Sequence, residues 1–175
     1  HGHRRNFDKL VKFCSLDKFA ARHVLLHELI HQEAESLLAK DTSHELCLMA
    51  AEWKCRFPDQ VHFLLSNHEL AQVNGHEISK NGRVVTIDFA NTVRQAYGSF
   101  ADKVLEAMYE FIRSFPLAGR TVNRVFLSHS LPGPRELPTF DVEVFRRKPT
   151  PVDLTERGSA HSLVWGRYQS ESVVS

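Results

Sequence analysis

The stretch from Val61 to Glu69 constrains the fold of this chain more than any other. Four of its first five residues are good strand formers, and Pro58-Asp59 just upstream is a typical stop signal. The pattern predicts a buried strand over Val61–Leu65. The polar residues Asn67 and His68 then follow where the strand ends. Since α/β proteins place their chemistry beyond the carboxyl ends of strands, we expect a functional site here.

Asn67 and His68 have side chains suited to catalysis with a metal. An Asn amide oxygen can ligate a hard divalent cation, and an adjacent imidazole can give a proton to a leaving group. An Asn at this position also suits the first turn of a helix, where its side chain would cap backbone N–H groups. The two residues alone leave both interpretations open.

Composition narrows the class of protein. The 175 residues are 42% hydrophobic and 25% charged, and 22 basic residues nearly balance 21 acidic ones. Such a balance predicts neither a nucleic-acid nor a membrane partner, and the length suits a single domain over residues 1–175. Three cysteines without a CxxC pair, Cys14, Cys47 and Cys55, favour reduced thiols and a cytoplasmic setting. Because the chain starts without Met and stops without a terminating element, we expect a domain that is incomplete at both termini.

Periodicity predicts the remaining elements. Helices are expected over 4–13, 33–40, 44–57, 86–97 and 101–115, a strand over 23–26, a hairpin over 117–127 turned at Asn123, and a loop over 149–158. Together with the strand over Val61–Leu65, this order predicts an α/β fold.

Residues 27–32 have two incompatible interpretations. As a helix, His27 and His31 would share one face beside Glu28, which is the HExxH pattern of zinc metallopeptidases. As the end of a strand, the segment would instead present the Glu28 carboxylate at the edge of a sheet. Local pattern does not decide between them.

Several motifs resemble one family, the calcineurin-like metallophosphoesterases, the superfamily of the phosphoprotein (Ser/Thr) phosphatases. Ser66-Asn67-His68-Glu69 resembles its Gly-Asn-His-Glu signature. His1-Gly2 resembles the end of Gly-Asp-x-His-Gly, 26–32 resembles Leu-Gly-Asp-x-x-Asp-Arg, 125–132 resembles Val-Phe-x-x-His-Gly-Gly-Leu, and 162–167 resembles Leu-Leu-Trp-x-x-Pro. The motifs occur in the order of the family across nearly the whole chain.

The resemblance implies a phosphatase with a dinuclear metal centre. It implies a two-sheet α/β sandwich flanked by helices in four layers, and two divalent or trivalent ions, Mn, Fe or Zn. His1 would ligate the first ion, Glu28 both, and Asn67 and His129 the second. A metal-bound hydroxide would attack a phosphorylated protein or small molecule, and His68 would protonate the leaving oxygen.

Two positions depart from the family pattern. His31 replaces the Asp that orients the catalytic His, and Gln32 replaces the Arg that grips phosphate. Arg167 or Arg135 could take over the phosphate contact. A zinc peptidase using His27, Glu28 and His31, and a non-catalytic module that kept the phosphatase fold, remain as alternatives.

Overall fold

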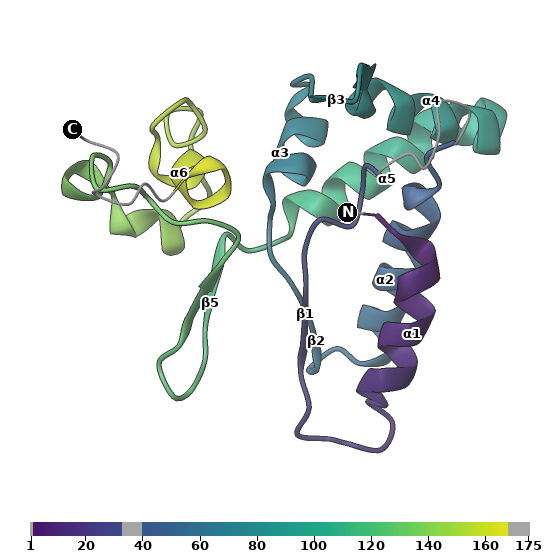
Figure 1. The fold of residues 1–175 in the computed structure, drawn as a ribbon, viewed down its shortest axis with the longest axis horizontal. Coiled ribbons are helices and arrows are strands. Elements are labelled where there is room, and N and C mark those ends of the chain that lie inside the picture. The colour runs from purple at the N-terminus through teal and green to yellow at the C-terminus, as the bar shows by residue number, and fades with distance from the viewer. Residues whose placement is uncertain (1, 33–39, 168–175) are drawn as a thin grey trace. The chain divides into compact units, whose positions relative to one another are not determined.

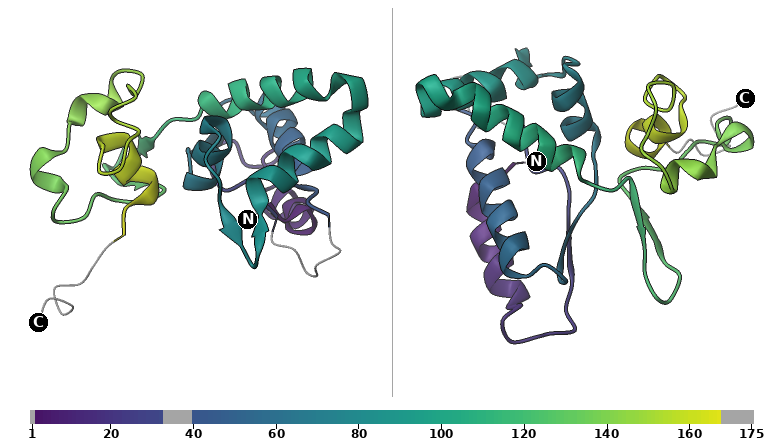
Figure 2. Two further views of the ribbon diagram at one scale, coloured as in Figure 1. Left: turned by 90° about the horizontal axis from the view of Figure 1, so that it is seen from above. Right: turned by 180° about the vertical axis from the view of Figure 1, so that it is seen from behind.

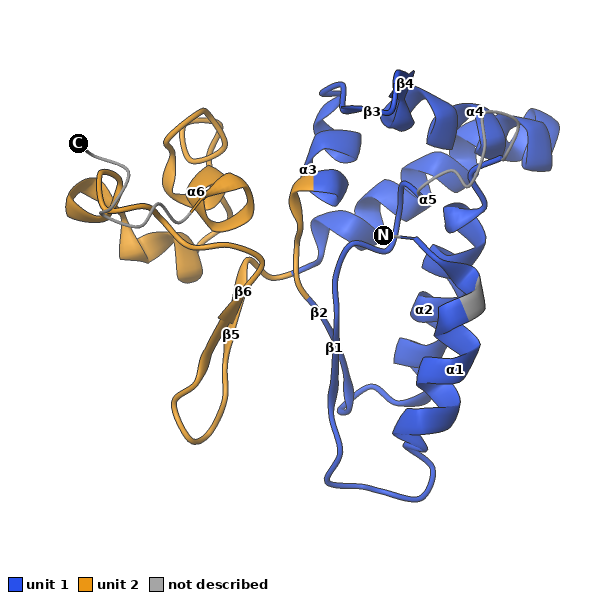
Figure 3. Ribbon diagram, viewed as in Figure 1, with its two compact units in different colours: residues 1–63, 68–115 blue, residues 64–67, 116–175 orange. Residues whose placement is uncertain are grey.

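The chain divides into two compact units in a computed structural model that describes residues 2–32 and 40–167. Unit 1 comprises His1–Phe63 and His68–Phe115, and unit 2 comprises Leu64–Asn67 and Pro116–Ser175 (Figure 3). No helix within the described ranges is both long and apolar enough to cross a membrane. Most of the expected helix over 33–40 lies outside the described residues.

Helices form most of unit 1 (Figure 1). They are α1 Arg4–Cys14, α2 Ser43–Arg56, α3 Asn67–Asn74, which starts with the last residue of unit 2, α4 Val85–Tyr97 and α5 Ala101–Arg113, with the 3₁₀ turn η1 at Gly98–Phe100. Helices α1 and α2 lie side by side, as do α4 and α5 (Figures 1 and 2). The ring of Phe7 on α1 meets Trp53 on α2 edge-on, with centroids 5.4 Å apart. The periodicities that predicted α1, α2, α4 and α5 therefore mark faces that pack in the core.

A short parallel sheet sets the position of the candidate site. β1 Val24–Leu26 pairs with β2 Val61–Phe63, with Val24 opposite Val61. Both predicted strands are confirmed, although β2 ends two residues earlier than expected. Because the strands are parallel, the segments that follow Leu26 and Phe63 leave from the same edge. The ring of Phe63 stacks on Phe115 at 4.6 Å, which packs β2 against the segment just after α5.

A two-residue turn joins the second sheet of unit 1. β3 Ser79–Lys80 and β4 Arg83–Val84 are antiparallel, and Asn81 and Gly82 between them have φ of 52° and 76°. Both residues tolerate this left-handed conformation, so the turn-prone Asn-Gly pair produces a tight hairpin.

Unit 2 contains the predicted hairpin and a short C-terminal helix. β5 Ala118–Arg120 pairs antiparallel with β6 Phe126–Ser128, followed by the 3₁₀ turns η2 Leu137–Thr139 and η3 Val142–Phe145 and by α6 Ser159–Trp165. The residue in the left-handed conformation at the hairpin turn is Arg124, with φ of 68°, next to the expected Asn123. Helix α6 was not expected from the sequence.

The loop over 149–158 is confirmed, and an arginine holds it in place. Arg147 donates to both carboxylate oxygens of Asp153, at 2.5 and 3.1 Å, and to Asp141 at 2.7 Å. Thr150 also donates to Asp153 through its backbone N–H, at 2.6 Å. These bonds hold the pKa of Asp153 well below its usual range.

The mixed α/β class is confirmed. The described residues form three sheets of two strands each. The finer four-layer sandwich stays a prediction, as does the single domain over residues 1–175.

Candidate functional site

The loop that follows β1 buries a histidine pair in unit 1. His31 is fully buried, and its Nδ1 lies 2.9 Å from Nδ1 of His68 in the first turn of α3. The two rings are tilted by 58°, with centroids 5.1 Å apart. The edge of the His31 ring meets Phe89 at 5.8 Å. Burial lowers the pKa of His31, which favours its neutral form.

Two further polar residues extend this pair. His31 Nε2 lies 2.7 Å from Oε1 of Gln72, and the Gln72 amide nitrogen donates to the Tyr109 hydroxyl at 2.9 Å. Gln72 is buried and lies one helical turn after His68 on α3. Four side chains from the β1 loop, α3 and α5 therefore form one hydrogen-bonded chain.

The backbone of the β1 loop excludes the peptidase helix. Residues 27–32 are not helical, and Glu28 and His31 have φ of 55° and 62°. His27 and His31 consequently do not share a helix face. Both ring nitrogens of His31 lie within hydrogen-bonding distance of protein atoms. The expectation of an HExxH zinc site is therefore wrong, because a helix cannot pass through two left-handed residues.

Glu69 holds this loop in its unusual conformation. The side chain is fully buried, and its carboxylate accepts from the backbone N–H of Leu29 at 2.6 Å and from that of Ile30. Burial raises the pKa of Glu69 to about 7, while these backbone donors act in the opposite direction. The sequence motif contains Glu69, but its position beside the polar Asn67 and His68 gives no sign of complete burial.

The start of α2 also supports the β1 loop. The backbone N–H of His31 donates to Ser43 Oγ at 2.9 Å, and Gln32 Oε1 accepts from the Thr42 hydroxyl at 2.8 Å. Gln32, which stands where the family has a phosphate-gripping Arg, is thus a neutral side chain bonded to α2. It does not supply a cation for phosphate.

The motif at His1-Gly2 and the motif over 26–32 lie together. The backbone N–H of Gly2 donates to the carbonyl of Glu28 at 3.1 Å. Gly2 has φ of 55°, and a Cβ there would lie 2.7 Å from Cβ of Ser43 and 2.8 Å from N of Gln32. Only glycine fits this approach. His1 precedes Gly2 in sequence but lies outside the described residues, and Glu28 is half-buried.

The motif that contains Asn67 and the motif that contains His129 meet in unit 2. Nε2 of His129, the residue after β6, lies 3.0 Å from Oδ1 of Asn67, which is 62 positions away in sequence. Asn67 is buried with 8% of its surface exposed. In this pair the ring N–H donates to the amide oxygen. The two residues that the resemblance assigns to one ion are thus direct neighbours.

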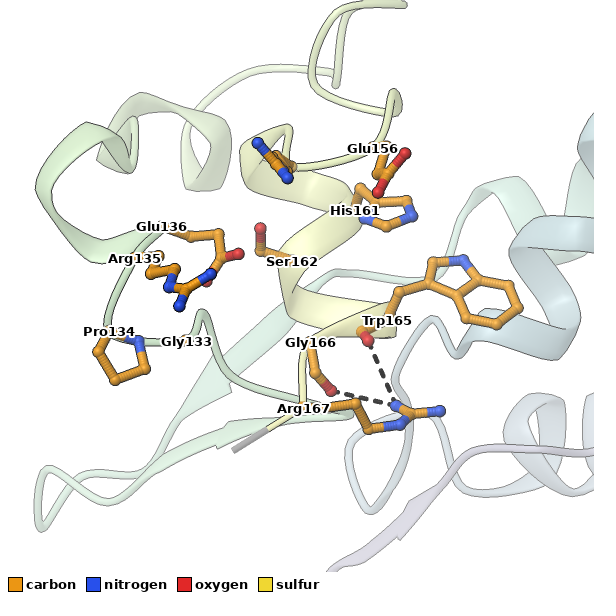
Figure 4. A pocket seen from close by; sticks show the side chains of 11 residues that line it. Gly133, Pro134, Arg135, Glu136, Glu156, His161, Ser162, Trp165, Gly166 and Arg167 are labelled. Atoms are coloured by element: carbon orange, nitrogen blue, oxygen red, sulfur yellow. Dashed lines mark hydrogen bonds between the residues drawn. The ribbon is translucent and has the colours of Figure 1, made fainter. Parts of the chain in front are cut away.

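The two arginines considered for phosphate binding line one pocket of unit 2 (Figure 4). This pocket, of about 300 Å³, also contains Arg157 and the stacked rings of His161 and Trp165, whose centroids are 6.1 Å apart. The complete lining comprises Gly133, Pro134, Arg135, Glu136, Glu156, Arg157, His161, Ser162, Trp165, Gly166 and Arg167.

The pocket is joined to the segment that carries His129. The next residue, Ser130, donates through Oγ to the carbonyl of Gly166 at 2.5 Å and through its backbone N–H to Leu163 at 2.7 Å. A Cβ on Gly166 would lie 2.0 Å from the carbonyl oxygen of Leu131, so this close packing requires glycine.

Sequence reasoning missed two members of the buried chain. Gln72 lies four residues after His68, the spacing that brings two side chains to one face of a helix, and this was the available signal. Tyr109 lies in an amphipathic helix that otherwise reads as core, and nothing in the sequence links it to His31.

Comparison with protein-family models, with curated proteins and with solved structures returned no match.

Proposed function

We propose that this chain is a metal-dependent phosphoester hydrolase of the phosphatase type. The observation that carries the proposal is the contact of 3.0 Å between Asn67 Oδ1 and His129 Nε2. His68, the proposed general acid, follows Asn67 directly in the chain. A proposed metal ligand and the proposed acid are thus consecutive residues, which supports phosphoester hydrolysis assisted by a metal.

The donor set fits a transition metal. Metal binding would require His129 to give up the Nε2 proton that it donates to Asn67, because an imidazole ligates through an unprotonated nitrogen. The separation of Asn67 Oδ1 and His129 Nε2 is 3.0 Å. An amide oxygen with imidazole suits Mn, Fe or Zn. Asn67 and His129 would hold one ion, and His1 and Glu28 would serve a second, with Glu28 shared.

The bound ions would neutralise phosphoryl charge and activate water for attack. The protein side chains supply the rest. His68 protonates the leaving oxygen, and His31, at 2.9 Å, fixes the orientation of its ring. Because His31 is uncharged where the family has a carboxylate, it stabilises a protonated His68 less strongly than a carboxylate would.

Phosphate recognition is assigned to the arginines of the unit 2 pocket. Gln32 provides no cation, while Arg135, Arg157 and Arg167 line one cavity. Guanidinium groups bind phosphate oxygens in a bidentate manner. The proposed substrate is a phosphorylated protein or small molecule, and the unpaired cysteines fit a reducing, cytoplasmic setting. The four-layer sandwich belongs to this proposal.

One observation favours a second candidate, a phosphatase-like module without activity. Gln32 is neutral and bonded to Thr42, so the phosphate-gripping cation of the family is lost from the β1 loop. Such a module would bind metal and phosphorylated ligand but would not turn them over.

Hydrolysis of aryl phosphates in Mn²⁺ tests the two candidates. His68→Asn should lower turnover roughly 10²–10⁴-fold while metal content stays unchanged, and substrates with good leaving groups should lose less. His62→Asn, a histidine change on β2, is the matched control and should retain turnover. Equal losses for good and poor leaving groups would contradict the acid role. Metal binding without turnover in the unaltered chain would favour the inactive module.

A further inference from the structure

The hydrogen-bonded chain from Tyr109 to His68 contains atoms that can fix where protons reside. Gln72 is oriented with Oε1 toward His31 Nε2, at 2.7 Å, and with its amide nitrogen toward the Tyr109 oxygen, at 2.9 Å. An amide oxygen only accepts hydrogen bonds. His31 must therefore carry a proton on Nε2 to donate to Gln72.

The proton on one nitrogen of His31 determines the role of the other. Burial lowers the pKa of His31, so the ring is neutral and has one N–H. With the proton on Nε2, Nδ1 of His31 is an acceptor. It lies 2.9 Å from Nδ1 of His68, and that nitrogen must then be the donor. In neutral His68 the unprotonated nitrogen is consequently Nε2.

The reverse arrangement is also self-consistent, which makes the Gln72 amide the deciding group. If the amide turned by 180°, its NH₂ group would donate to His31 Nε2, and Tyr109 would donate to its oxygen. His31 would then carry its proton on Nδ1 and donate to His68, leaving the proton of neutral His68 on Nε2. The two arrangements have the same number of protons and differ only in the direction of the bonds.

We propose that Gln72 is a positioning residue that fixes the tautomer of His31 and through it that of His68. In neutral His68, Nδ1–H is then bonded to His31, with 2.9 Å between the two nitrogens. The consequence for hydrolysis rests on the proposed function, but the tautomers themselves do not. A buried neutral His31, oriented by a neutral amide, thus does the positioning that a carboxylate does in the family this chain resembles.

The test is the tautomeric state of both histidines, read from long-range ¹H–¹⁵N spectra of the ¹⁵N-histidine-labelled chain. We expect Nε2–H on His31 and Nδ1–H on His68. A wild-type spectrum with Nδ1–H on His31 would overturn the proposal without any variant.

Two substitutions at Gln72 separate positioning from folding. Gln72→Glu retains an oxygen acceptor for His31 and should keep both tautomers. Gln72→Met has a similar length without an acceptor, and should lose the fixed tautomers and lower turnover by up to about 10²-fold, within the range of general acid–base catalysis. Unchanged tautomers in a folded Gln72→Met would overturn the proposal. If Gln72→Met does not fold, the wild-type spectrum still decides it.

The spectra also separate this inference from the proposed function. Expected tautomers together with absent phosphatase activity in Mn²⁺ would sustain the positioning role and contradict the hydrolase. Activity with the opposite tautomers would sustain the hydrolase and contradict the role of Gln72.

Discussion

Replacing Glu69 with Ala should destabilise the chain by about 3 kcal/mol. The carboxylate is fully buried and accepts from the backbone N–H groups of Leu29 and Ile30. Its removal leaves two buried donors without an acceptor, at about 1–3 kcal/mol each. Loss of a buried acid that ionises with difficulty offsets part of this cost. For a chain of this size, we expect the melting temperature to fall by roughly 6–12 °C.

The acidity of Glu69 gives this prediction a pH dependence. Burial raises the pKa of Glu69 from 4.5 in the unfolded chain to about 7 in the folded state. The folded state therefore binds this proton more tightly, and the contribution of Glu69 to stability falls as pH rises from about 4.5 to about 7. The fall amounts to about 3 kcal/mol, since each pKa unit corresponds to roughly 1.4 kcal/mol.

Urea denaturation followed by tryptophan fluorescence at pH 5 and pH 8 measures both effects. Glu69→Gln is the matched control, because it keeps one acceptor oxygen but cannot ionise. The stability of the wild type relative to Glu69→Gln should decrease between pH 5 and pH 8. A Glu69→Ala variant within about 0.5 kcal/mol of wild type, which is the range of ordinary surface changes, would refute the role of Glu69 in holding the β1 loop.

Three further predictions concern other parts of the chain. Asp153→Asn should loosen the loop over 149–158, measured as faster proteolysis of that loop. Because Arg147 lowers the pKa of Asp153, the stabilisation of the wild-type loop by Asp153 should persist above about pH 4 and be lost as pH falls further. A rate of proteolysis of the wild-type loop that stays within about twofold between pH 2 and pH 5 would contradict this. Gly2→Ala should lower the melting temperature, since its φ is 55° and the added Cβ would meet α2; an unchanged value would refute that packing. Alkylation at pH 8, followed by mass spectrometry, should modify Cys55 before Cys47, because Cys47 is buried and its pKa is raised to about 12; preferential modification of Cys47 would contradict the burial.

Local pattern was sufficient to predict the regular elements. The helical spacing of apolar residues predicted α1, α2, α4 and α5, and short apolar runs predicted β1 and β2. In each case the signal is carried by residues that pack in the core, such as Phe89 and Ile112, which are fully buried. Helix α3 was missed because its first residues, Asn67 to Glu69, are polar and read as the end of a strand.

The candidate site was only partly predictable. The family resemblance identified Asn67 and His129, which are 3.0 Å apart, and paired His31 with His68. The burial of Glu69 was not predictable, because it depends on donors that become available only when the β1 loop adopts left-handed conformations. Sequence patterns describe single elements, whereas this polar cluster joins three segments through backbone groups.

Mn²⁺ binding by a double-mutant cycle tests the central claim most directly, namely that Asn67 and His129 hold the same ion. Asn67→Ala and His129→Ala should each weaken binding by at least about tenfold in calorimetric titrations. The double variant should be only slightly weaker than either single variant, because both lose the same site. Unchanged affinity in the single variants, or losses that add in full as for two independent sites, would contradict the account.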